Sequence, residues 1–265
     1  MNYSSVSLTA STQTQTQVVI DPSFGDVVGL AVNLNVEAAG TLTSPTPVTR
    51  AISQFVVTDN QGKTLFQLQG RDLDKVAFLL SPSGTYTSAG NNSSSAYVYW
   101  DAVIPINISV KHQPAKAIVT FAPYSALASS GATGGTLNLS VDVVYGSSNG
   151  FTNAINVAQV TLSSGTNSYS SQLANMNTTL FGFSVGTESN INYVNFSPDG
   201  KVDVYSSQTL QTFIDLDNEF TQSGHETGIF NLYVGPFAYN TASSRFVVNG
   251  AGSDTIYVYQ IGSAD

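Results

Sequence analysis

The stretch Ile52–Leu80, ISQFVVTDNQGKTLFQLQGRDLDKVAFLL, decides the fold, because the later stretch Ile191–Phe220, INYVNFSPDGKVDVYSSQTLQTFIDLDNEF, has the same organisation. Each has an alternating apolar segment, a Gly-Lys turn, a second alternating segment and a run with helical spacing. Alternation predicts half-buried strands, and a turn between two of them predicts a hairpin. We therefore expect strand, turn, strand and short helix to occur twice.

The run that ends each stretch predicts a short amphipathic helix with one buried stripe. The apolar positions with helical spacing are Leu73, Val76, Ala77 and Leu80 in the first run, and Leu210, Phe213 and Ile214 in the second. We expect Asp72 to cap the first helix and Thr209 or Ser207 to cap the second, because these side chains accept hydrogen bonds from free helical N–H groups.

The two stretches lie about one domain length apart, whereas the repeats of a solenoid recur every ~20 to 50 residues. This spacing therefore indicates two related domains. A chain of 265 residues has room for both. The Gly/Ser-rich segment 146–150 is typical of a linker. We therefore predict a first domain over residues 1–148 and a second over residues 149–265.

The rest of the chain predicts an all-β protein. Short alternating segments recur throughout both halves, and helices are expected only in connections. The polar segment 1–17 is expected to be an arm or an edge strand, and Ser81–Ser95 a long exposed loop. About eight short strands in each half fit a two-sheet sandwich of the jelly-roll type.

Composition excludes several classes of function. Charged residues make up 9% of the chain, against about 25% in ordinary soluble proteins. The 17 acidic and 8 basic side chains give a net charge of −9, which argues against direct nucleic-acid binding through phosphate neutralisation. The chain has no cysteine, so thiol chemistry and cysteine-ligated metals are excluded.

The sparse charge also bears on location. Few ion pairs would break in acid, so we infer a setting outside the cell or at low pH. Residues 1–17 lack the basic and apolar regions of a signal peptide, and no segment reaches the ~18 apolar residues of a membrane span. Release inside a particle or a non-classical secretion route would reconcile these observations.

The chain resembles the double jelly-roll major capsid proteins of tailless icosahedral viruses, a lineage that includes membrane-containing bacteriophages, archaeal turreted viruses and adenovirus. The resemblance covers nearly the whole chain and consists of two tandem jelly rolls, a hairpin followed by a short helix at matching places, and a Gly/Ser linker near residue 148. It implies a structural protein of the virion, without catalytic activity or cofactor, that is assembled in the host cytoplasm.

The resemblance also implies partners. Three copies are expected to form a trimer of six rolls with a pseudo-hexagonal outline, which then tiles a shell. Penton or minor capsid proteins are the other expected partners, and in such viruses an internal membrane can lie beneath the shell. Aromatic residues on loops are then expected to include intersubunit contacts, or else to pack within a roll; the candidates are Tyr86, Tyr124, Phe237 and Tyr239.

Candidate ligands and catalytic groups are few. The densest acidic run has five candidate oxygen or nitrogen ligands for a metal such as calcium: Asp215, Asp217, Glu219, His225 and Glu226. The loop spacing of an EF-hand is absent, so a solvated helix end is the expected state and no metal site is assigned. Asp72 and Asp74 are interpreted as first-turn acids stabilised by the helix dipole. His112 and His225 lie in different halves without a nucleophile motif nearby, so we expect no catalytic triad.

Two other function classes stay open at this point. A secreted or surface β-sandwich could bind carbohydrate through an exposed Trp100 and tyrosines, and a glycoside hydrolase would need two carboxylates that face one cleft. The segment Gly131–Gly135 lacks the Lys-Ser/Thr of a phosphate loop and predicts a turn. Of the Asn-x-Ser/Thr triplets, Asn91 and Asn92 on the expected long loop are the candidates for glycosylation.

Overall fold

The computed structural model describes residues 2–8, 15–39, 48–80, 86–91, 95–122, 134–147, 152–198, 203–206, 208–210 and 228–263. These residues fall into two compact units that divide between Thr152 and Asn153. The boundary expected between residues 148 and 149 lies outside the described residues and stays a prediction.

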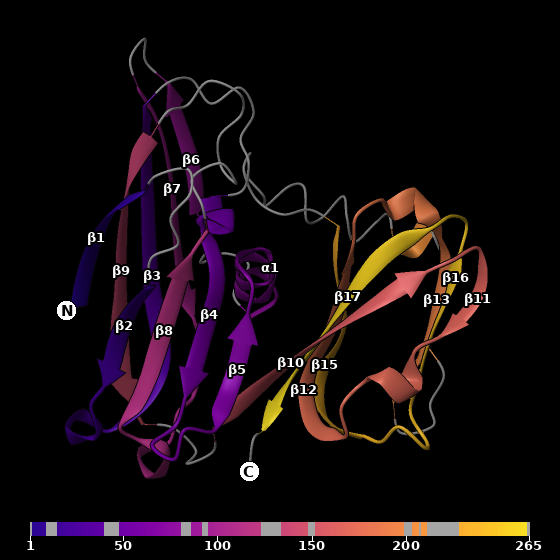
Figure 1. The fold of residues 1–265 in the computed structure, drawn as a ribbon. Coiled ribbons are helices and arrows are strands. Elements are labelled where there is room, and N and C mark those ends of the chain that lie inside the picture. The colour runs from indigo at the N-terminus through magenta and orange to yellow at the C-terminus, as the bar shows by residue number, and fades with distance from the viewer. Residues whose placement is uncertain are drawn as a thin grey trace. The chain divides into compact units, whose positions relative to one another are not determined.

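The described part of the first unit has nine strands and one α-helix. The strands are β1 (Asn2–Leu8), β2 (Gln15–Ile20), β3 (Asp26–Ala39), β4 (Ile52–Thr58), β5 (Thr64–Leu68), β6 (Tyr86–Asn91), β7 (Ser95–Ile104), β8 (Ala115–Phe121) and β9 (Gly134–Gly146), and the helix is α1 (Gly70–Leu80). They form a five-stranded sheet, β1-β9-β3-β7-β6, and a four-stranded sheet, β2-β8-β4-β5. Figure 1 shows the two sheets face to face.

The described part of the second unit has eight strands. They are β10 (Asn153–Leu162), β11 (Gly165–Ser168), β12 (Met176–Val185), β13 (Ile191–Ser197), β14 (Asp203–Ser206), β15 (Ile229–Tyr239), β16 (Arg245–Gly250) and β17 (Asp254–Ser263). They form two four-stranded antiparallel sheets, β10-β17-β12-β15 and β11-β16-β13-β14.

Both units have the same strand order. When β6 is set aside, the first, eighth, third and sixth strands form one sheet of each unit, and the second, seventh, fourth and fifth form the other. This crossed order is that of the jelly roll, which packs eight strands into two sheets. The prediction of an all-β double jelly roll is confirmed, with β6 as an additional strand in the first unit.

Strand β6 corrects one expectation, because it lies within Ser81–Ser95, which the sequence predicted to be a loop. Its residues pair with β7 from Tyr86 opposite Asp101 to Asn91 opposite Ala96. The strand is rich in small and polar residues and lies at the edge of its sheet, where backbone pairing with β7 supplies order that side chains do not signal. The segment 1–17 was expected to be an arm or an edge strand. It contains β1, which pairs with β9 at the edge of the sheet, so the edge strand is the alternative observed.

The duplicated stretch is the same piece of both rolls. In the first unit β4 and β5 form the hairpin, Gly62 in the turn has a φ of 81°, and α1 follows. In the second unit β13 and β14 pair, and residues 208–210 are helical. Leu73, Val76 and Ala77 are fully buried, which confirms three of the four positions of the predicted stripe, whereas Leu80 at the end of the helix is half-buried. Leu210 is buried as well, whereas Phe213 and Ile214 lie outside the described residues.

The predicted cap of the first helix was wrong, and of the two candidates for the second helix Ser207 lies outside the described residues. Helix α1 begins at Gly70, so Asp72 lies in its first turn and accepts a hydrogen bond from the Gln69 N–H at 3.3 Å. In the second unit Ser206 Oγ accepts from the Thr209 N–H at 3.2 Å, so Thr209 lies within the helix and is not its cap. Helix α1 therefore begins earlier than side-chain preference alone indicated.

The two cores differ in composition. The first is mainly aliphatic, with Trp100 as its largest residue, 1% exposed. Trp100 Nε1 donates to Asp74 Oδ1 at 2.7 Å, and Asp74 is itself buried. The interpretation of Asp74 as a first-turn acid is wrong, because α1 begins at Gly70 and Asp72 is the acid of its first turn, whereas the Asp74 carboxylate is the partner of a core indole. An indole N–H needs such a partner once it is removed from water.

The second core is aromatic. The Phe181 ring stacks on Phe196 at 4.2 Å and meets Phe246 edge-on at 5.4 Å, while Phe183 stacks on Phe230 at 4.7 Å. Phe237 and Tyr239 belong to the same cluster, 5% and 2% exposed. Burial raises the pKa of Tyr239 to about 12, because the phenolate would be desolvated there.

Candidate functional site at one end of the first unit

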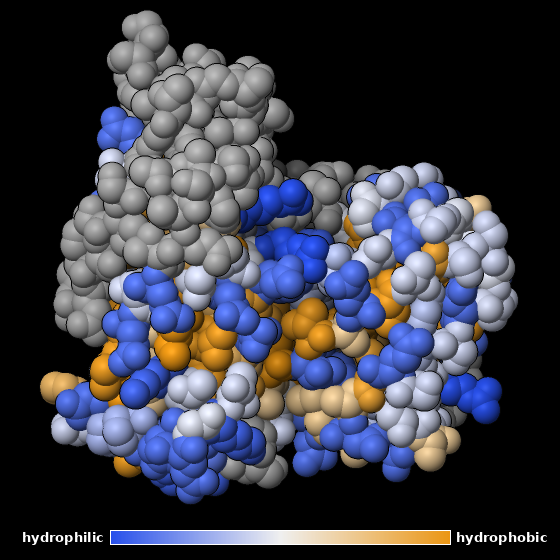
Figure 2. All heavy atoms as spheres, in the orientation of Figure 1, coloured by the Kyte–Doolittle hydropathy of each residue, from blue (hydrophilic) through white to orange (hydrophobic). Residues whose placement is uncertain are grey.

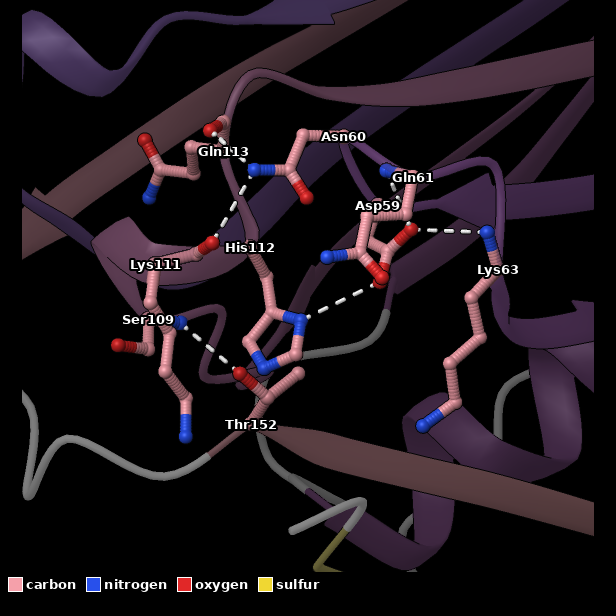
Figure 3. A network of polar contacts seen from close by, with 9 residues as sticks. All are labelled: Asp59, Asn60, Gln61, Lys63, Ser109, Lys111, His112, Gln113 and Thr152. Atoms are coloured by element: carbon pink, nitrogen blue, oxygen red, sulfur yellow. Dashed lines mark hydrogen bonds and ion pairs between the residues drawn. The ribbon is translucent and has the colours of Figure 1, made fainter.

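Polar loops gather at one end of the first unit, where β4 passes into β5 and β7 passes into β8 (Figure 1). The β4–β5 turn carries Asp59, and the short 3-10 helix Val110–His112 lies in the β7–β8 connection. Figure 3 shows the side chains of these two segments turned toward one another. We therefore take this meeting of two connections as the candidate site.

Asp59 is the centre of the network. Its Oδ1 accepts from the N–H groups of Gln61 at 2.9 Å and Lys63 at 2.8 Å, and its Oδ2 lies 3.3 Å from His112 Nδ1 (Figure 3). Burial raises the pKa of the Asp59 carboxyl, but these hydrogen bonds and the neighbouring imidazole outweigh burial and hold the pKa below its ordinary value. The carboxylate therefore stays ionised and fixes the turn.

The amides of Asn60 and Gln113 extend this network. Asn60 Nδ2 donates to the carbonyl oxygens of Lys111 at 3.1 Å and Gln113 at 3.0 Å. The buried Gln113 side chain donates to the carbonyl oxygens of Gly25 at 3.1 Å and Ile108 at 3.0 Å. The β4–β5 turn, the β7–β8 connection and the turn before β3 are thus held together by side-chain amides.

The chain that leaves the first unit is anchored beside the network. The Ser109 N–H donates to Thr152 Oγ1 at 3.1 Å, and Thr152 is fully buried (Figure 3). Thr152 is the last residue of this unit before Asn153 begins the second. The network therefore also holds the exit of the polypeptide from the first roll.

The chemistry of this network is structural. His112 and Asp59 form a pair like the base and orienting acid of a triad, and Figure 3 draws the Thr152 hydroxyl beside the imidazole, where it accepts the Ser109 N–H. Both carboxylate oxygens already have partners within the fold. We therefore interpret the pair as a clamp between two connections.

The end of the first unit that carries the Asp59 network exposes both lysine and apolar side chains. Lys63 and Lys111 are exposed, and in Figure 3 both side chains extend away from the network. Next to them, Phe24 is 70% exposed and Val110 is 43% exposed. Phe24 packs on Tyr145 at a ring distance of 5.4 Å, and the Val110 N–H donates to Asp26 Oδ1 at 2.7 Å, so both residues sit beside the start of β3.

Further apolar residues lie on the outer faces of the first unit. Val103 and Val144 are 47% and 39% exposed and flank Gly29 on the five-stranded sheet. Figure 2 shows hydrophobic side chains among hydrophilic ones over the sheet of β2, β8, β4 and β5. There Val19 is 50% exposed, and Val56 pairs with Ile118.

Most sequence-based site candidates are not brought together. Trp100 is buried, which removes the exposed stacking residue that the carbohydrate-binding alternative required. Phe237 and Tyr239 lie in β15 and pack inside the second roll, so for these two the expected alternative of packing within a roll is the one observed. Tyr86 lies in edge strand β6, and Tyr124 lies outside the described residues.

The metal, glycosylation and turn candidates fall largely outside the described residues. These are Asp215, Asp217, Glu219, His225, Glu226, Asn92 and residues 131–133. Asn91 ends β6, and Gly134 and Gly135 begin β9. Within the part of the chain that the structure describes, no group of three or more His, Asp or Glu residues could hold a metal ion.

One finding concerns membranes. Among the helices that the structure describes, none is long and apolar enough to cross a bilayer.

Sequence reasoning missed the site itself. The Gly62-Lys63 turn after Asp59 was predicted from the sequence, but nothing local indicates that Asp59 meets His112, 53 positions later. The positions of Phe24 and Val110 beside the network were not predictable from the sequence, because single apolar residues in short connections do not show periodicity.

No family model and no curated protein sequence matches this chain. Several solved structures, however, are similar to it over nearly its whole length. The major capsid protein of Sulfolobus turreted icosahedral virus aligns over 98% of this chain and 95% of its own, with 11% identity and a TM-score of 0.69. A capsid chain of the PBCV-1 virus aligns over 99% and 93%, with 8% identity and a TM-score of 0.58.

The major capsid protein of bacteriophage PM2 is also similar, over 100% of this chain and 98% of its own, with 11% identity and a TM-score of 0.53. At such low identities the likeness establishes the fold. By strand order and by this comparison the chain is a double jelly-roll protein.

One prediction arises from the Asp59 clamp. Because folding lowers the pKa of Asp59, its contribution is complete above the unfolded pKa of about 3.9 and disappears as the pH falls through the lower folded value. Asp59→Asn should lower the unfolding free energy by about 1 to 2 kcal/mol at pH 7. The difference from the wild type should shrink toward zero between about pH 4 and pH 2.

The measurement is urea unfolding followed by Trp100 fluorescence, since Trp100 reports on the first unit. Glu37→Gln, an exposed substitution on β3 with the same change of charge, is the control and should leave stability nearly unchanged. An Asp59→Asn difference that stays constant down to pH 2 would contradict the clamp.

Proposed function

We propose that this protein is a major capsid protein that assembles as trimers into the shell of a tailless icosahedral virus. The observation that carries the proposal is the whole-length likeness to capsid proteins, with two tandem rolls of identical strand order. Fold alone does not specify function. Here, however, duplication provides a physical reason for the role.

Two equivalent rolls in one chain suit a subunit that must fill a lattice of nearly six-fold symmetry. A trimer of such chains presents six similar rolls, so one chain can occupy positions of nearly six-fold symmetry in a shell. Neither a sugar-binding module nor a hydrolase requires this duplication. The exposed apolar residues of the first unit support self-association, since an obligate assembly buries such surface.

Under this proposal the protein is located in the virion and has no catalytic role. Penton or minor capsid proteins would be its other partners. The shell would be able to enclose an internal membrane. Sugar hydrolysis or specific glycan binding by the purified chain would speak against a purely structural role.

The decisive experiment is the mass and outline of the purified protein. Light scattering should give three times the 27.9 kDa of the chain, and negative-stain images should show a hexagonal profile. A monodisperse monomer at all concentrations tested would overturn the proposal.

A further inference from the structure

The first strand of each roll has the same place in its sheet but is joined to the next strand in a different way. Strand β1 lies at the edge of its sheet, next to β9 (Figure 1), and β10 lies at the edge of its sheet, next to β17. The six residues 9–14 connect β1 to β2, whereas two residues, Ser163 and Ser164, connect β10 to β11. We call residues 9–14 the tether of β1.

The tether is longer than the crossing between the two sheets of the first unit requires. Leu8, just before it, pairs with Gly135 near the start of β9. Gln15, just after it, pairs with Thr120 near the end of β8. Both ends of the tether therefore lie where β8 passes into β9, on sheets that pack about 10 Å apart. Six residues can extend over about 20 Å, so the tether has length to spare.

Strand β10 is held in its own roll by side chains. Val160 and Leu162 are 3% and 0% exposed and belong to the aromatic core, and Ile155 is 6% exposed. The strand also pairs with β17 along all ten of its residues. Removal of β10 from its sheet would therefore expose that core to water, at a cost proportional to the apolar area uncovered.

Strand β1 has a sequence of a different kind. It reads Asn-Tyr-Ser-Ser-Val-Ser-Leu, in which two of the seven residues are aliphatic. Two of its polar residues, Asn2 and Ser4, have core residues of β9 as their register partners. Strands rich in polar residues depend on backbone pairing and are prone to alternative pairings and to exchange between copies. The attachment of β1 therefore consists mainly of its backbone ladder with β9.

We propose that β1 is an exchangeable arm, and that in the assembled protein it pairs with β9 of a neighbouring copy. Closed and exchanged pairing contain the same seven residue pairs, so neighbours that exchange arms lose no part of the ladder. The advantage of the closed form is the effective concentration that the tether provides, which falls as a tether lengthens. The β9 edge that one arm leaves is covered by the arm of another copy, so no strand edge stays open.

This inference rests on the proposed function, because exchange requires copies that assemble. It goes beyond that function by naming the segment that joins the copies and the strand that receives it. Strand β10, with its buried side chains and two-residue connection, is expected to stay in its own roll. The two rolls therefore differ in this respect although their strand order is the same.

Disulfide trapping tests the exchange, because the chain has no cysteine of its own. Ser7 of β1 and Thr136 of β9 are register partners, and directly opposite residues of an antiparallel pair are close enough for a disulfide. The variant Ser7→Cys/Thr136→Cys is oxidised in the assembled state and denatured without reductant. We expect covalent species of two or three chains on electrophoresis, which a reductant converts to single chains. Single chains with an internal disulfide would overturn the exchange.

The matched control is Thr161→Cys/Thr255→Cys, at register partners of β10 and β17 in the second unit. Thr161 is exposed and Thr255 is half-buried, so both positions accept the substitution without a change in the core. Because β10 stays in its own roll, this variant should give single chains with an internal disulfide. Multimers at the same level in the control would show that oxidation joins copies at random, and would count against the exchange.

A mixture of two single variants gives an independent measurement. Ser7→Cys and Thr136→Cys are unfolded together in urea, refolded and assembled, and Trp100 fluorescence verifies that both are folded. Mass spectrometry of the oxidised sample then identifies the disulfides. A bond between position 7 of one variant and position 136 of the other requires β1 of one copy on β9 of another. Its absence from assembled protein would overturn the inference.

The outcomes separate the exchange from the proposed function. If the wild type has the mass of a trimer and the β1–β9 variant gives single chains, the exchange is overturned and the capsid proposal stands. A wild type that is monomeric at all concentrations tested would overturn both. Disulfides between copies at positions 7 and 136, together with single chains in the control, would support the exchange.

Discussion

Phe181→Ala should lower the unfolding free energy of the second unit by about 4 kcal/mol, the middle of the range for a buried phenylalanine. Phe181 is fully buried in β12, where its ring contacts Phe196, Tyr239 and Phe246. Truncation removes those contacts and leaves a cavity among rigid rings, which cannot collapse into it without breaking their own stacking.

Circular dichroism during urea unfolding measures this effect. The transition that reports on the second unit should move to lower urea, while the Trp100 fluorescence transition of the first unit should move much less. Phe24→Ala is the matched control, because it deletes the same atoms from a ring that is 70% exposed and should change stability by at most about 0.5 kcal/mol. Equal losses in both variants would mean that Phe181 is not a core residue.

Gly70→Ala should destabilise the first unit by about 3 kcal/mol, the upper part of the range for overpacking. A Cβ at Gly70 would lie 1.9 Å from the Thr49 carbonyl oxygen and 2.5 Å from that of Ile52. Both atoms are backbone, so neither can move without displacing the start of β4. The first turn of α1 must therefore approach this backbone without a side chain.

The sign of the stability change in Gly70→Ala distinguishes the close backbone approach from helix propensity. Helix propensity alone predicts that Gly→Ala within a helix stabilises by about 1 kcal/mol, the opposite of the expected result. Gly62→Ala is a useful comparison, since Gly62 has a φ of 81° but a Cβ at this position would meet no atom within 4 Å, and strain alone should cost about 1 kcal/mol there. Trp100 fluorescence during urea unfolding measures both variants. A Gly70→Ala variant as stable as the wild type would contradict the close approach.

The fold was largely predictable because its signals are local and repeated. Two hairpins, each followed by a helix, recur at matching places, and the buried stripe of Leu73, Val76 and Ala77 follows from periodicity alone. The predicted all-β double jelly roll agrees with the observed strand order in both units. Strand β6 escaped prediction, because its small polar residues have no alternation and owe their conformation to β7.

The candidate site was far less predictable. The Asp59–His112 pair joins residues 53 positions apart, and its partners come from three separate connections. Trp100 shows the same limit: as a single aromatic residue in a strand it was compatible with a sugar-binding surface until its hydrogen bond to Asp74 showed that it lies in the core. Residue types alone do not reveal which polar groups meet.

The sequence by itself determined the two-domain organisation, the strand and helix pattern of the duplicated stretch, and the scarcity of charge, because each depends on composition or on short-range periodicity. Only the tertiary structure decided where α1 begins, which aromatic residues are buried, and how the lysine-bearing end is held. These features depend on contacts between distant segments, such as Gly70 with Thr49 and Asp59 with His112, whose formation depends on the packing of the whole roll.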